Sequence, residues 1–339
     1  MTKRVTIQVV AEAAEVSSAA VSLFLNNKPG LADITRERIK ATIDALGYIP
    51  RKALVQQPQR ALISLSVEKL PFSMFSELHY GVILHSMQAE AQNLGYDLVL
   101  NVFEGTQNKS LNMPQNVDGV LVLGGGDITE GVVSDLLQSV CPVLLVDVHF
   151  PLIRATSVLA DNFGGAQAIT KYLLGCGYRR IACIQGPNKY PSLVERFQGY
   201  CVSLIEAGMG VDPRIVQPSI SEGFPNKGYR EMKALLKQGR SFDAVFCVSD
   251  RAALGALQAL QEASIRVPDD LGLVGFEDVP QAEFSSPPLT TVKMPKAAMG
   301  KIAIQQIVSM IHGASLDEAM KIVLPTELVK RNSTAAPPS

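Results

Sequence analysis

Few residues of this 339-residue chain stand in the spacings that metal binding or covalent catalysis requires. The four histidines form no HExxH pair, and the five cysteines form no CxxC pair. The glycine-rich run "GGGD" at 124–127 lacks the Lys-Ser/Thr that completes a phosphate-binding loop, and no GxGxxG follows the first predicted strand. Serines in "SPP" and "VSD" have no histidine in a triad order. We therefore expect no metal, no cofactor and no enzymatic activity.

The chemistry that the chain does offer is a set of short hydrogen-bonding side chains on an uncharged helix. The stretch "SSAAVSLFLN" at 17–26 places Val21, Phe24 and Leu25 at helical spacing, which predicts an apolar inner face. Its outer face carries hydroxyls and small residues. Small side chains such as Ser18 and Ala19 allow the backbone of this helix to approach another molecule closely.

Two further helices must position this stretch. Thr6 can cap a helix that ends before "EVS", and a third helix is predicted in "DITRERIKATIDALGY", with Gly47 as its stop. Three short helices with a tight turn between the first two predict a helix-turn-helix unit, whose second helix can enter a major groove. The residues expected on the inner faces of the first and third helices are Ile7, Val10, Ala11, Ala14, Ile39, Ile43 and Leu46.

Charge is distributed unevenly along the chain. Residues 1–60 hold nine basic and five acidic side chains, whereas the whole chain has a net charge of -1. A small basic unit beside a mildly acidic body is typical of a module that meets polyanions. A solvated basic surface would have the same composition, so charge alone leaves both interpretations open.

The composition, 47% hydrophobic and 19% charged, is typical of a soluble globular protein. No apolar run approaches the roughly 18 residues that span a bilayer. The opening "MTKRVTIQVVAEAAE" reaches acidic residues too early for a secretory signal. We expect a cytoplasmic protein with no membrane partner.

From residue 61 onward, short apolar runs alternate with segments of helical period. Such alternation indicates parallel sheets covered by helices on both faces, and about 270 residues are too many for one such sheet. We therefore expect an α/β body of two lobes with a cleft at the carboxyl ends of the strands. The predicted strands are "ALISLSV", "DLVLNVF", "GVLVLG", "PVLLVDV", "RIACIQG", "DAVFCV" and "LGLVGF", and the predicted helices are 76–94, 164–175, 193–208, 227–238 and 251–263.

Several segments carry a resemblance to a known family. The opening "VTIQVVAEAAEVSSAAVSLFLNNKPGLADITRERIKATIDALGYIP" resembles the DNA-binding headpiece of the LacI/GalR family of bacterial transcription regulators. The resemblance continues through "ADNFGGAQAITKYLLGCGYRRIACIQGP", "ERFQGY", "VPDDLGLVGFEDVP" and "SPPLTTVKMPKAAMG". It implies a helix-turn-helix headpiece and a two-lobed, periplasmic-binding-protein-like body with parallel sheets. It also implies crossings between the lobes near Asp161, Thr290 and Leu324.

The resemblance also implies which residues meet DNA. Hydroxyl and amide side chains are expected to contact or orient the phosphates, because short donors fix register without reading sequence. The same serines and Asn26 are equally compatible with capping and turn roles. Base contacts are expected at Ser18, Ala19 and Leu23, and phosphate contacts at Thr6, Ser17, Ser22, Asn26, Thr35 and Tyr48. Arg51 is expected to bind DNA as well.

The headpiece departs from the family pattern at several positions. Leu23 stands where an arginine is common, so a contact worth roughly 1–3 kcal/mol of base discrimination is missing. We therefore expect an unusual operator, with weaker sequence preference than the family norm. Ala20 replaces a frequent threonine and Val9 a usual acidic residue. Glu15 replaces the usual glycine of the turn, which predicts mild backbone strain or a slightly different turn.

The linker departs as well. The family's hinge helix inserts a leucine into the minor groove, but this chain has Gln57 there and Pro58 directly after it, and proline ends helices. Leu54 or Val55 could replace that leucine, but we expect a weaker hinge, with a plain flexible tether as the alternative.

The expected cleft should bind a small molecule. Arg196 in "ERFQGY" matches the family arginine that grips effector hydroxyls or a carboxylate. Asp147 and Glu277 are acceptors at strand ends, and Asp250 is interpreted rather as the N-cap of the helix "RAALGALQAL". Glu277 and Ser249 replace the family's usual Asp and Asn. The full candidate set is Phe72, Asp147, Ser192, Arg196, Phe224, Ser249, Asp250 and Glu277.

These expectations combine into one hypothesis and one alternative. The hypothesis is a ligand-responsive repressor that binds a near-palindromic double-stranded operator as a homodimer, controlled by a sugar-like effector. The alternative is a cytoplasmic solute-binding module with a weakly specific headpiece. The tail lacks a leucine heptad, so we expect dimers only.

The predicted boundaries are 1–50 for the headpiece, 51–60 for the linker, 61–161 plus 291–323 for the N-terminal lobe, 162–290 plus 324–331 for the C-terminal lobe, and 332–339 for the tail.

Overall fold

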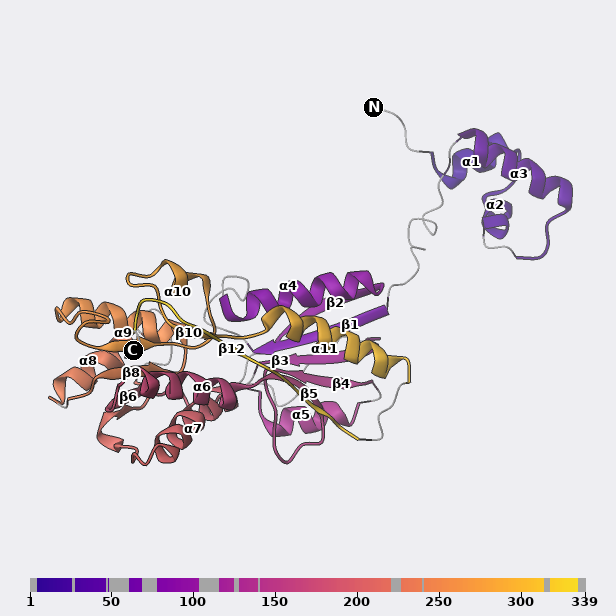
Figure 1. Cartoon of the computed structure of the whole chain (residues 1–339). Coiled ribbons are helices and arrows are strands. Elements are labelled where there is room, and N and C mark those ends of the chain that lie inside the picture. The colour runs from indigo at the N-terminus through magenta and orange to yellow at the C-terminus, as the bar shows by residue number, and fades with distance from the viewer. Residues whose placement is uncertain are drawn as a thin grey trace. The chain divides into compact units, whose positions relative to one another are not determined.

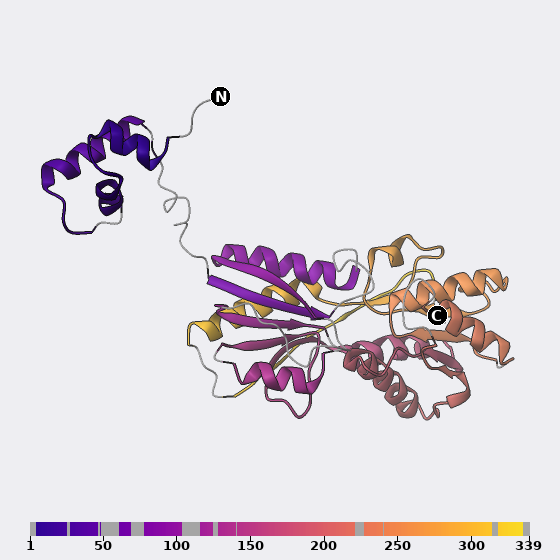
Figure 2. The ribbon, with the colours of Figure 1, turned by 180° about the vertical axis from the view of Figure 1, so that it is seen from behind.

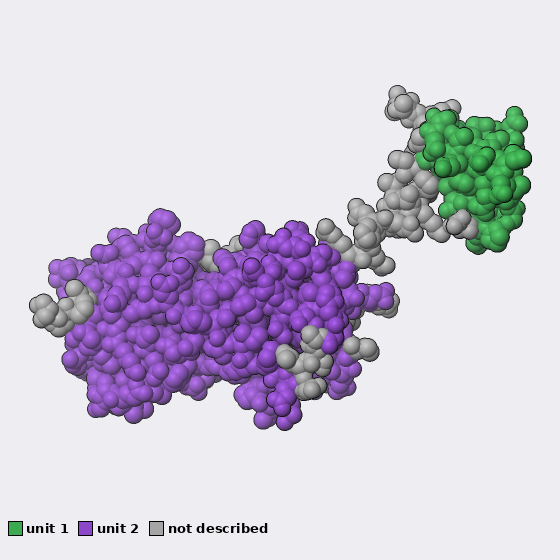
Figure 3. All heavy atoms as spheres, turned by 45° about the vertical axis from the view of Figure 1, so that its right-hand side comes forward, with its two compact units in different colours: residues 1–60 green, residues 61–339 purple. Residues whose placement is uncertain are grey.

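The structure is a computed structural model, which describes residues 5–25, 28–46, 48, 61–68, 78–103, 116–124, 128–139, 141–220, 227–239, 241–313 and 318–334. The chain separates into two compact units, Met1–Arg60 and Ala61–Ser339 (Figure 3). We call the first unit the headpiece and the second the body.

The headpiece contains helices α1 (Ile7–Ala13), α2 (Ser18–Leu25) and α3 (Asp33–Leu46). The predicted caps are present: the Thr6 hydroxyl accepts a hydrogen bond from the Val9 amide, and Ser17 Oγ accepts one from the Ala20 amide at 3.2 Å. The directions of α1 and α2 differ by 108°, as expected for a helix-turn-helix. The buried core that joins the three helices is Val10, Ala11, Ala14, Val21 and Ile39.

Glu15 lies in the turn between α1 and α2 with a φ of 52°. This is the left-handed region, which costs a residue with a Cβ roughly 1–2 kcal/mol. The prediction of local strain at this position is therefore confirmed, because the turn keeps the conformation that glycine usually supplies.

The first sheet of the body, within the described residues, has six parallel strands in the order β11-β5-β4-β3-β1-β2. Apolar side chains of β1 pack with those of α4 (Leu78–Asn93) and α11 (Lys296–Ile311), and outward-alternating residues of β3 and β4 pack with those of α5 (Glu130–Leu137). The ribbon shows α4 and α11 on one side of this sheet and α5 on the other (Figure 1). We call this sheet with α4, α5 and α11 the N-lobe. Its strands are β1 (Ala61–Glu68), β2 (Tyr96–Phe103), β3 (Gly119–Leu123), β4 (Val143–Val146), β5 (Thr156–Ala160) and β11 (Lys321–Leu324).

The second sheet has four parallel strands among the described residues, in the order β7-β6-β8-β9. Helices α6 (Asn162–Gly175) and α7 (Pro191–Glu206) cover one face, while α8 (Tyr229–Lys237) and α9 (Asp250–Glu262) cover the other. We call this sheet with α6–α10 the C-lobe. Its remaining elements are β6 (Ile181–Ile184), η1 (Pro213–Ile215), β7 (Val216–Gln217), β8 (Ala244–Cys247), β9 (Gly272–Val274) and α10 (Pro280–Phe284).

The chain passes between the two lobes through short extended segments. β5 of the first sheet leads directly into α6, and β11 leads into β12 (Glu327–Val329). β12 pairs antiparallel with β10 (Thr291–Lys293), which precedes α11. The C-terminal segment runs from the N-lobe to the C-lobe in both ribbon views (Figure 1; Figure 2). The expected α/β architecture with parallel sheets is confirmed.

Candidate DNA-binding surface and effector site

The predicted base-reading residues lie on the outer face of α2. Ser18, Ala19 and Ser22 are exposed, whereas Val21 is fully buried against α1 and α3. Leu23 is half-buried, so part of its side chain packs and part remains accessible. This helix therefore presents hydroxyls and small side chains outward, with one apolar residue at the edge of that surface.

The expected phosphate contacts are distributed around that face. Thr6 and Ser17 are exposed at the starts of α1 and α2, and their hydroxyls are engaged as caps. Thr35 is half-buried in the first turn of α3, and Tyr48 packs partly against the core. A hydroxyl that caps a helix still has a proton to donate to a phosphate oxygen, so both proposed roles are compatible. Asn26 and Arg51 lie outside the described residues.

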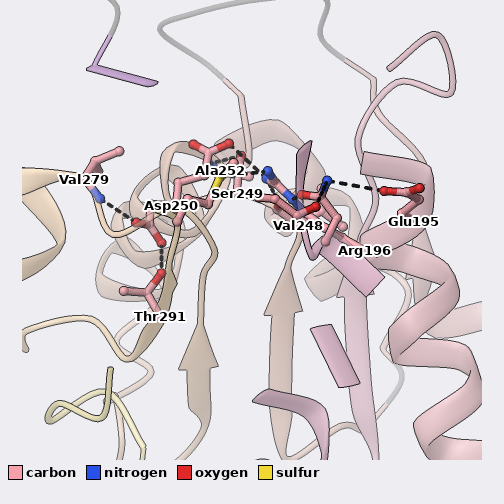
Figure 4. Close-up of polar contacts among 12 residues, drawn as sticks. Glu195, Arg196, Val248, Ser249, Asp250, Ala252, Val279 and Thr291 are labelled. Carbon is pink, nitrogen blue, oxygen red and sulfur yellow. Dashed lines mark hydrogen bonds and ion pairs between the residues drawn. The ribbon is translucent and has the colours of Figure 1, made fainter. Parts of the chain in front are cut away.

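In the body, Arg196 has 1% of its surface exposed and is held by four partners. Its Nε donates to Asn162 Oδ1 at 2.9 Å, and its Nη1 donates to the Val248 carbonyl and to Glu277 Oε1, each at 2.9 Å (Figure 4). Its Nη2 lies 3.3 Å from Met294 Sδ. The guanidinium is therefore fixed in one orientation, because a planar fork bound on several sides loses its rotational freedom.

The ring of Phe276 lies 4.1 Å from the Arg196 guanidinium carbon, in cation-π geometry. The next residue, Glu277, has a φ of 116°, and its amide donates to the Val292 carbonyl at 2.7 Å. Glu277 thus combines a strained backbone with an ion pair between its carboxylate and Arg196. Strain of this kind is common at binding sites, where it holds a side chain in one position.

Two lysines, Lys296 and Lys227, lie close to Arg196 and Glu277. Burial lowers the pKa of Lys296, the first residue of α11, and the nearby Glu277 and Asp250 carboxylates oppose this effect. Burial also lowers the pKa of Lys227, an effect that Glu277 opposes. The region around Arg196 therefore combines buried cations with carboxylates that compensate their charge.

The predicted N-cap of α9 was wrong. Ser249 is the N-cap, with its Oγ accepting from the Ala252 amide at 3.3 Å, and Asp250 is the first helical residue. Asp250 is fully buried and accepts from Thr291 Oγ1 at 2.5 Å and from the Val279 amide at 2.9 Å (Figure 4). Burial raises the pKa of Asp250 to about 7. Its carboxyl group thus joins α9 to β10 and to the start of α10.

The other predicted effector contacts are more scattered. Asp147 follows β4, is 6% exposed and has a φ of 60°. Ser192 is half-buried in the first turn of α7, one turn before Arg196. Phe72 and Phe224 lie outside the described residues. The structure thus brings Arg196 and Glu277 into direct contact, with Ser249 and Asp250 directly after the Val248 carbonyl that Arg196 binds.

Sequence reasoning missed most of the residues that hold Arg196. Asn162, Phe276 and Met294 are its partners, and Glu195 touches Asn162. Phe276 and Met294 have no periodic or motif signal that separates them from core residues. Asn162 follows a predicted crossing in "ADNFGG", and its position there was the available signal.

Within the described ranges, no group of three or more His, Cys, Asp or Glu side chains is placed to hold a metal ion. No single helix there is long and apolar enough to span a membrane. Helices α1 and α2 meet that test only as a bent pair, and their apolar residues are those of the headpiece core.

A helix-turn-helix unit followed by a body of two parallel-sheet lobes defines the class of ligand-controlled transcription regulators. Residues 6–51 match bacterial regulatory proteins of the lacI family, and residues 170–334 match the periplasmic binding protein-like domain. The HTH-type transcriptional regulator CelR of Thermobifida fusca is 32% identical, over 98% of this chain and 98% of its own. The chain therefore belongs to the lacI family of bacterial regulatory proteins, and it is a DNA-binding transcriptional regulator.

Other transcriptional regulators also match nearly the whole chain. The HTH-type transcriptional repressor CytR of Escherichia coli (strain K12) is 29% identical, over 98% of this chain and 97% of its own. A solved structure of the transcriptional regulator CelR-cellobiose complex is 31% identical, covers 97% of this chain and 100% of that chain, and has a TM-score of 0.71. These similarities extend over both units of the molecule.

Proposed function

We propose that this regulator is a repressor that binds a near-palindromic operator as a homodimer and is controlled by a sugar or sugar derivative bound in the body. The observation that carries the proposal is Arg196, whose buried guanidinium is fixed by Asn162 and Met294, which lie where the chain passes between the lobes, and by Glu277 of the C-lobe. The cellobiose bound to the related CelR supports a sugar as the class of effector.

Arg196 and Glu277 provide complementary chemistry for a polyhydroxylated ligand. The guanidinium donates, the carboxylate accepts, and each sugar hydroxyl can do both. Asp147, Ser192, Ser249, Phe72 and Phe224 are proposed to complete the site. The proposed lobe boundaries remain 161/162, 290/291 and 323/324, so that a ligand between the lobes can stabilise one arrangement of them.

On the headpiece, we propose that Ser18, Ala19 and Leu23 meet base edges and that the surrounding hydroxyls meet phosphates. One small headpiece makes too few phosphate contacts for tight binding at cellular salt, whereas two in a dimer raise the effective concentration of the second. This argument supports a homodimer on a two-fold operator. Because operator DNA is its proposed target, we place its activity in the cytoplasm.

The experiment is fluorescence anisotropy of the full chain on a DNA sequence selected from a random pool, against scrambled DNA, across a salt series with and without sugars. We expect at least a hundredfold preference, about 2.7 kcal/mol, and a steep salt dependence. Cellobiose is the first sugar to test. Equal affinity for both DNAs with sugar binding retained would instead indicate a solute-binding module with a nonspecific headpiece.

Variants separate the two sites in the same assay. Arg196→Lys should weaken sugar binding because a lysine lacks the planar fork, while the headpiece residues that meet DNA are unchanged. Arg214→Lys is the matched control, since Arg214 forms an exposed ion pair with Asp212 on the C-lobe surface. If both substitutions leave sugar affinity unchanged, Arg196 is not the anchor of the effector.

A further inference from the structure

Three side chains form a polar cluster between the lobes, beside the effector site but outside it. Glu195 of α7 lies in the C-lobe, and its Oε1 is 3.8 Å from His149 Nε2 and 3.7 Å from Lys321 Nζ. Lys321 Nζ is also 3.3 Å from His149 Nε2. His149 follows β4 and Lys321 begins β11, so both belong to N-lobe segments. We call Glu195, His149 and Lys321 the inter-lobe cluster.

The second carboxylate oxygen of Glu195 points toward the effector site. Asn162 Nδ2 donates to Glu195 Oε2 at 3.3 Å, and Asn162 Oδ1 accepts from Arg196 Nε at 2.9 Å (Figure 4). Asn162 is 2% exposed and also donates to the Ala160 carbonyl at the end of β5. A continuous series of polar contacts therefore runs from Arg196 through Asn162 and Glu195 to the N-lobe.

The charges in this cluster favour the observed arrangement. Burial lowers the pKa of His149, Lys321 lowers it further, and Glu195 opposes both. A neutral His149 with its proton on Nδ1 can accept from the Lys321 ammonium, which leaves the positive charge of Lys321 attracted to Glu195. Glu195 is thus held from the N-lobe side by the charge of Lys321, which His149 helps to orient.

We propose that Glu195 is a positioning residue that ties the orientation of Arg196 to the arrangement of the two lobes. A ligand that engages Arg196 shifts Asn162, and Asn162 in turn shifts the Glu195 carboxylate against Lys321 and His149. The part of this proposal that concerns the ligand rests on the proposed function, whereas the contact between the lobes does not. The two parts are therefore tested separately.

The contact is tested by distance measurements between spin labels in the full-length protein. The labels are placed on Leu137→Cys of α5 and Phe284→Cys of α10, two residues with exposed fractions of 37% and 82%. The half-buried Cys141 and Cys201 are replaced by serine in every sample. Labelled chains are diluted with an excess of unlabelled protein, so that only distances within one chain are observed.

Without sugar, Glu195→Gln and Lys321→Met should each shift or broaden the distribution of distances between the lobes. The double variant should do no more than either one, because both remove the same attraction. Glu206→Gln is the matched control: it breaks an ion pair of the same helix with Lys171, but both partners lie in the C-lobe. A distribution for Glu195→Gln that coincides with that of the parent would overturn the proposal.

The connection to Arg196 has its own readout. Arg196→Lys removes the Nε donor to Asn162, so the distance distribution should change in the same direction as in Glu195→Gln, whereas Arg214→Lys should leave it unchanged.

With cellobiose, the change in DNA affinity, typically about 5- to 150-fold in such switches, should shrink several-fold in Glu195→Gln and not in Glu206→Gln. If the parent's DNA affinity does not respond to cellobiose, cellobiose is not the effector. The distance distributions without sugar still test whether Glu195 links the lobes. Distances unaffected by Arg196→Lys would disprove the connection.

Discussion

The headpiece and the body use their polar residues in opposite ways. On α2 of the headpiece, Ser18, Ala19 and Ser22 are exposed and lie within five positions of one another. In the body, Arg196 is 1% exposed, and its partners are 34, 52, 81 and 98 residues away in the chain. An exposed helix face suits a reversible contact with a large polyanion, whereas a buried network suits orienting a small ligand.

The largest effect is expected from removing the buried cation. Arg196→Ala leaves the Glu277 carboxylate, 13% exposed, without its ion-pair partner, and such losses destabilise by about 3–5 kcal/mol. Urea unfolding followed by circular dichroism measures the change. Arg214→Ala removes an exposed arginine and should change stability little. Equal losses in the free energy of unfolding for the two variants would show that the burial of Arg196 contributes nothing to stability.

The second prediction concerns the dependence of stability on pH. The pKa of Asp250 is about 7 in the folded state and near 3.8 when unfolded, so the folded state binds more protons between these values. Stability should therefore fall as pH rises from about 4 to 7, by about 1.4 kcal/mol per unit of pKa difference. Asp250→Asn, which stays neutral and can still bond Thr291 and Val279, should flatten this slope.

The control for this prediction is Asp270→Asn. The Arg266 side chain lowers the pKa of Asp270 to about 2, so Asp270 is ionised in both states above pH 5. Its substitution should leave the slope between pH 5 and 7 as in the parent. Stability curves from urea unfolding at each pH provide the comparison, and parallel curves for the parent and Asp250→Asn would contradict the expectation.

The third prediction changes the specificity of the headpiece without changing the body. Leu23→Arg places a bidentate donor at the edge of the α2 surface, and a matching G·C pair should be preferred by about 1–3 kcal/mol. Selection from random DNA followed by anisotropy measures the preference. Leu23→Met is the control, since it keeps an apolar side chain of similar size. If the parent already showed a sharp G·C preference, the claim that Leu23 leaves one base contact missing would be refuted.

The smallest effect is expected in the turn of the headpiece. Glu15→Gly relieves a left-handed conformation and should slow amide exchange in α1 and α2, by up to about 1 kcal/mol of local stability. Glu12→Gly, inside α1, should have the opposite sign, because glycine costs about 1 kcal/mol within a helix. Hydrogen exchange in the full chain resolves both. Faster exchange in Glu15→Gly would show that the turn is not strained.

Much of the fold could be predicted from local patterns. The runs predicted as strands include β1, β2, β3, β4, β6, β8 and β9, because buried parallel strands are continuously apolar. The predictions did not include β5 and β11, which flank the crossings, the two-residue strand β7, or β10 and β12, which are three residues long and pair with each other. A strand that short carries too few residues for a period, and its existence depends on its partner.

The candidate sites show the same difference between contacts within one element and contacts between distant segments. The caps Thr6 and Ser17 and the strain at Glu15 could be predicted, because each acts within one helical turn. The role of Asp250 could not. Its place before a helical run suggested a cap, but its partners Thr291 and Val279 come from other segments, and burial favours a carboxyl group that accepts from both.

The sequence by itself determined the helix-turn-helix unit, the exposed face of α2 and the choice of Arg196, since these depend on side-chain period, capping and motif. Only the tertiary structure decided that Arg196 is held by Asn162, Glu277 and Met294, and that Glu195 reaches from the C-lobe to His149 and Lys321. Periodicity reports which side of an element is buried. It does not report which distant element buries it, because that depends on how the lobes pack.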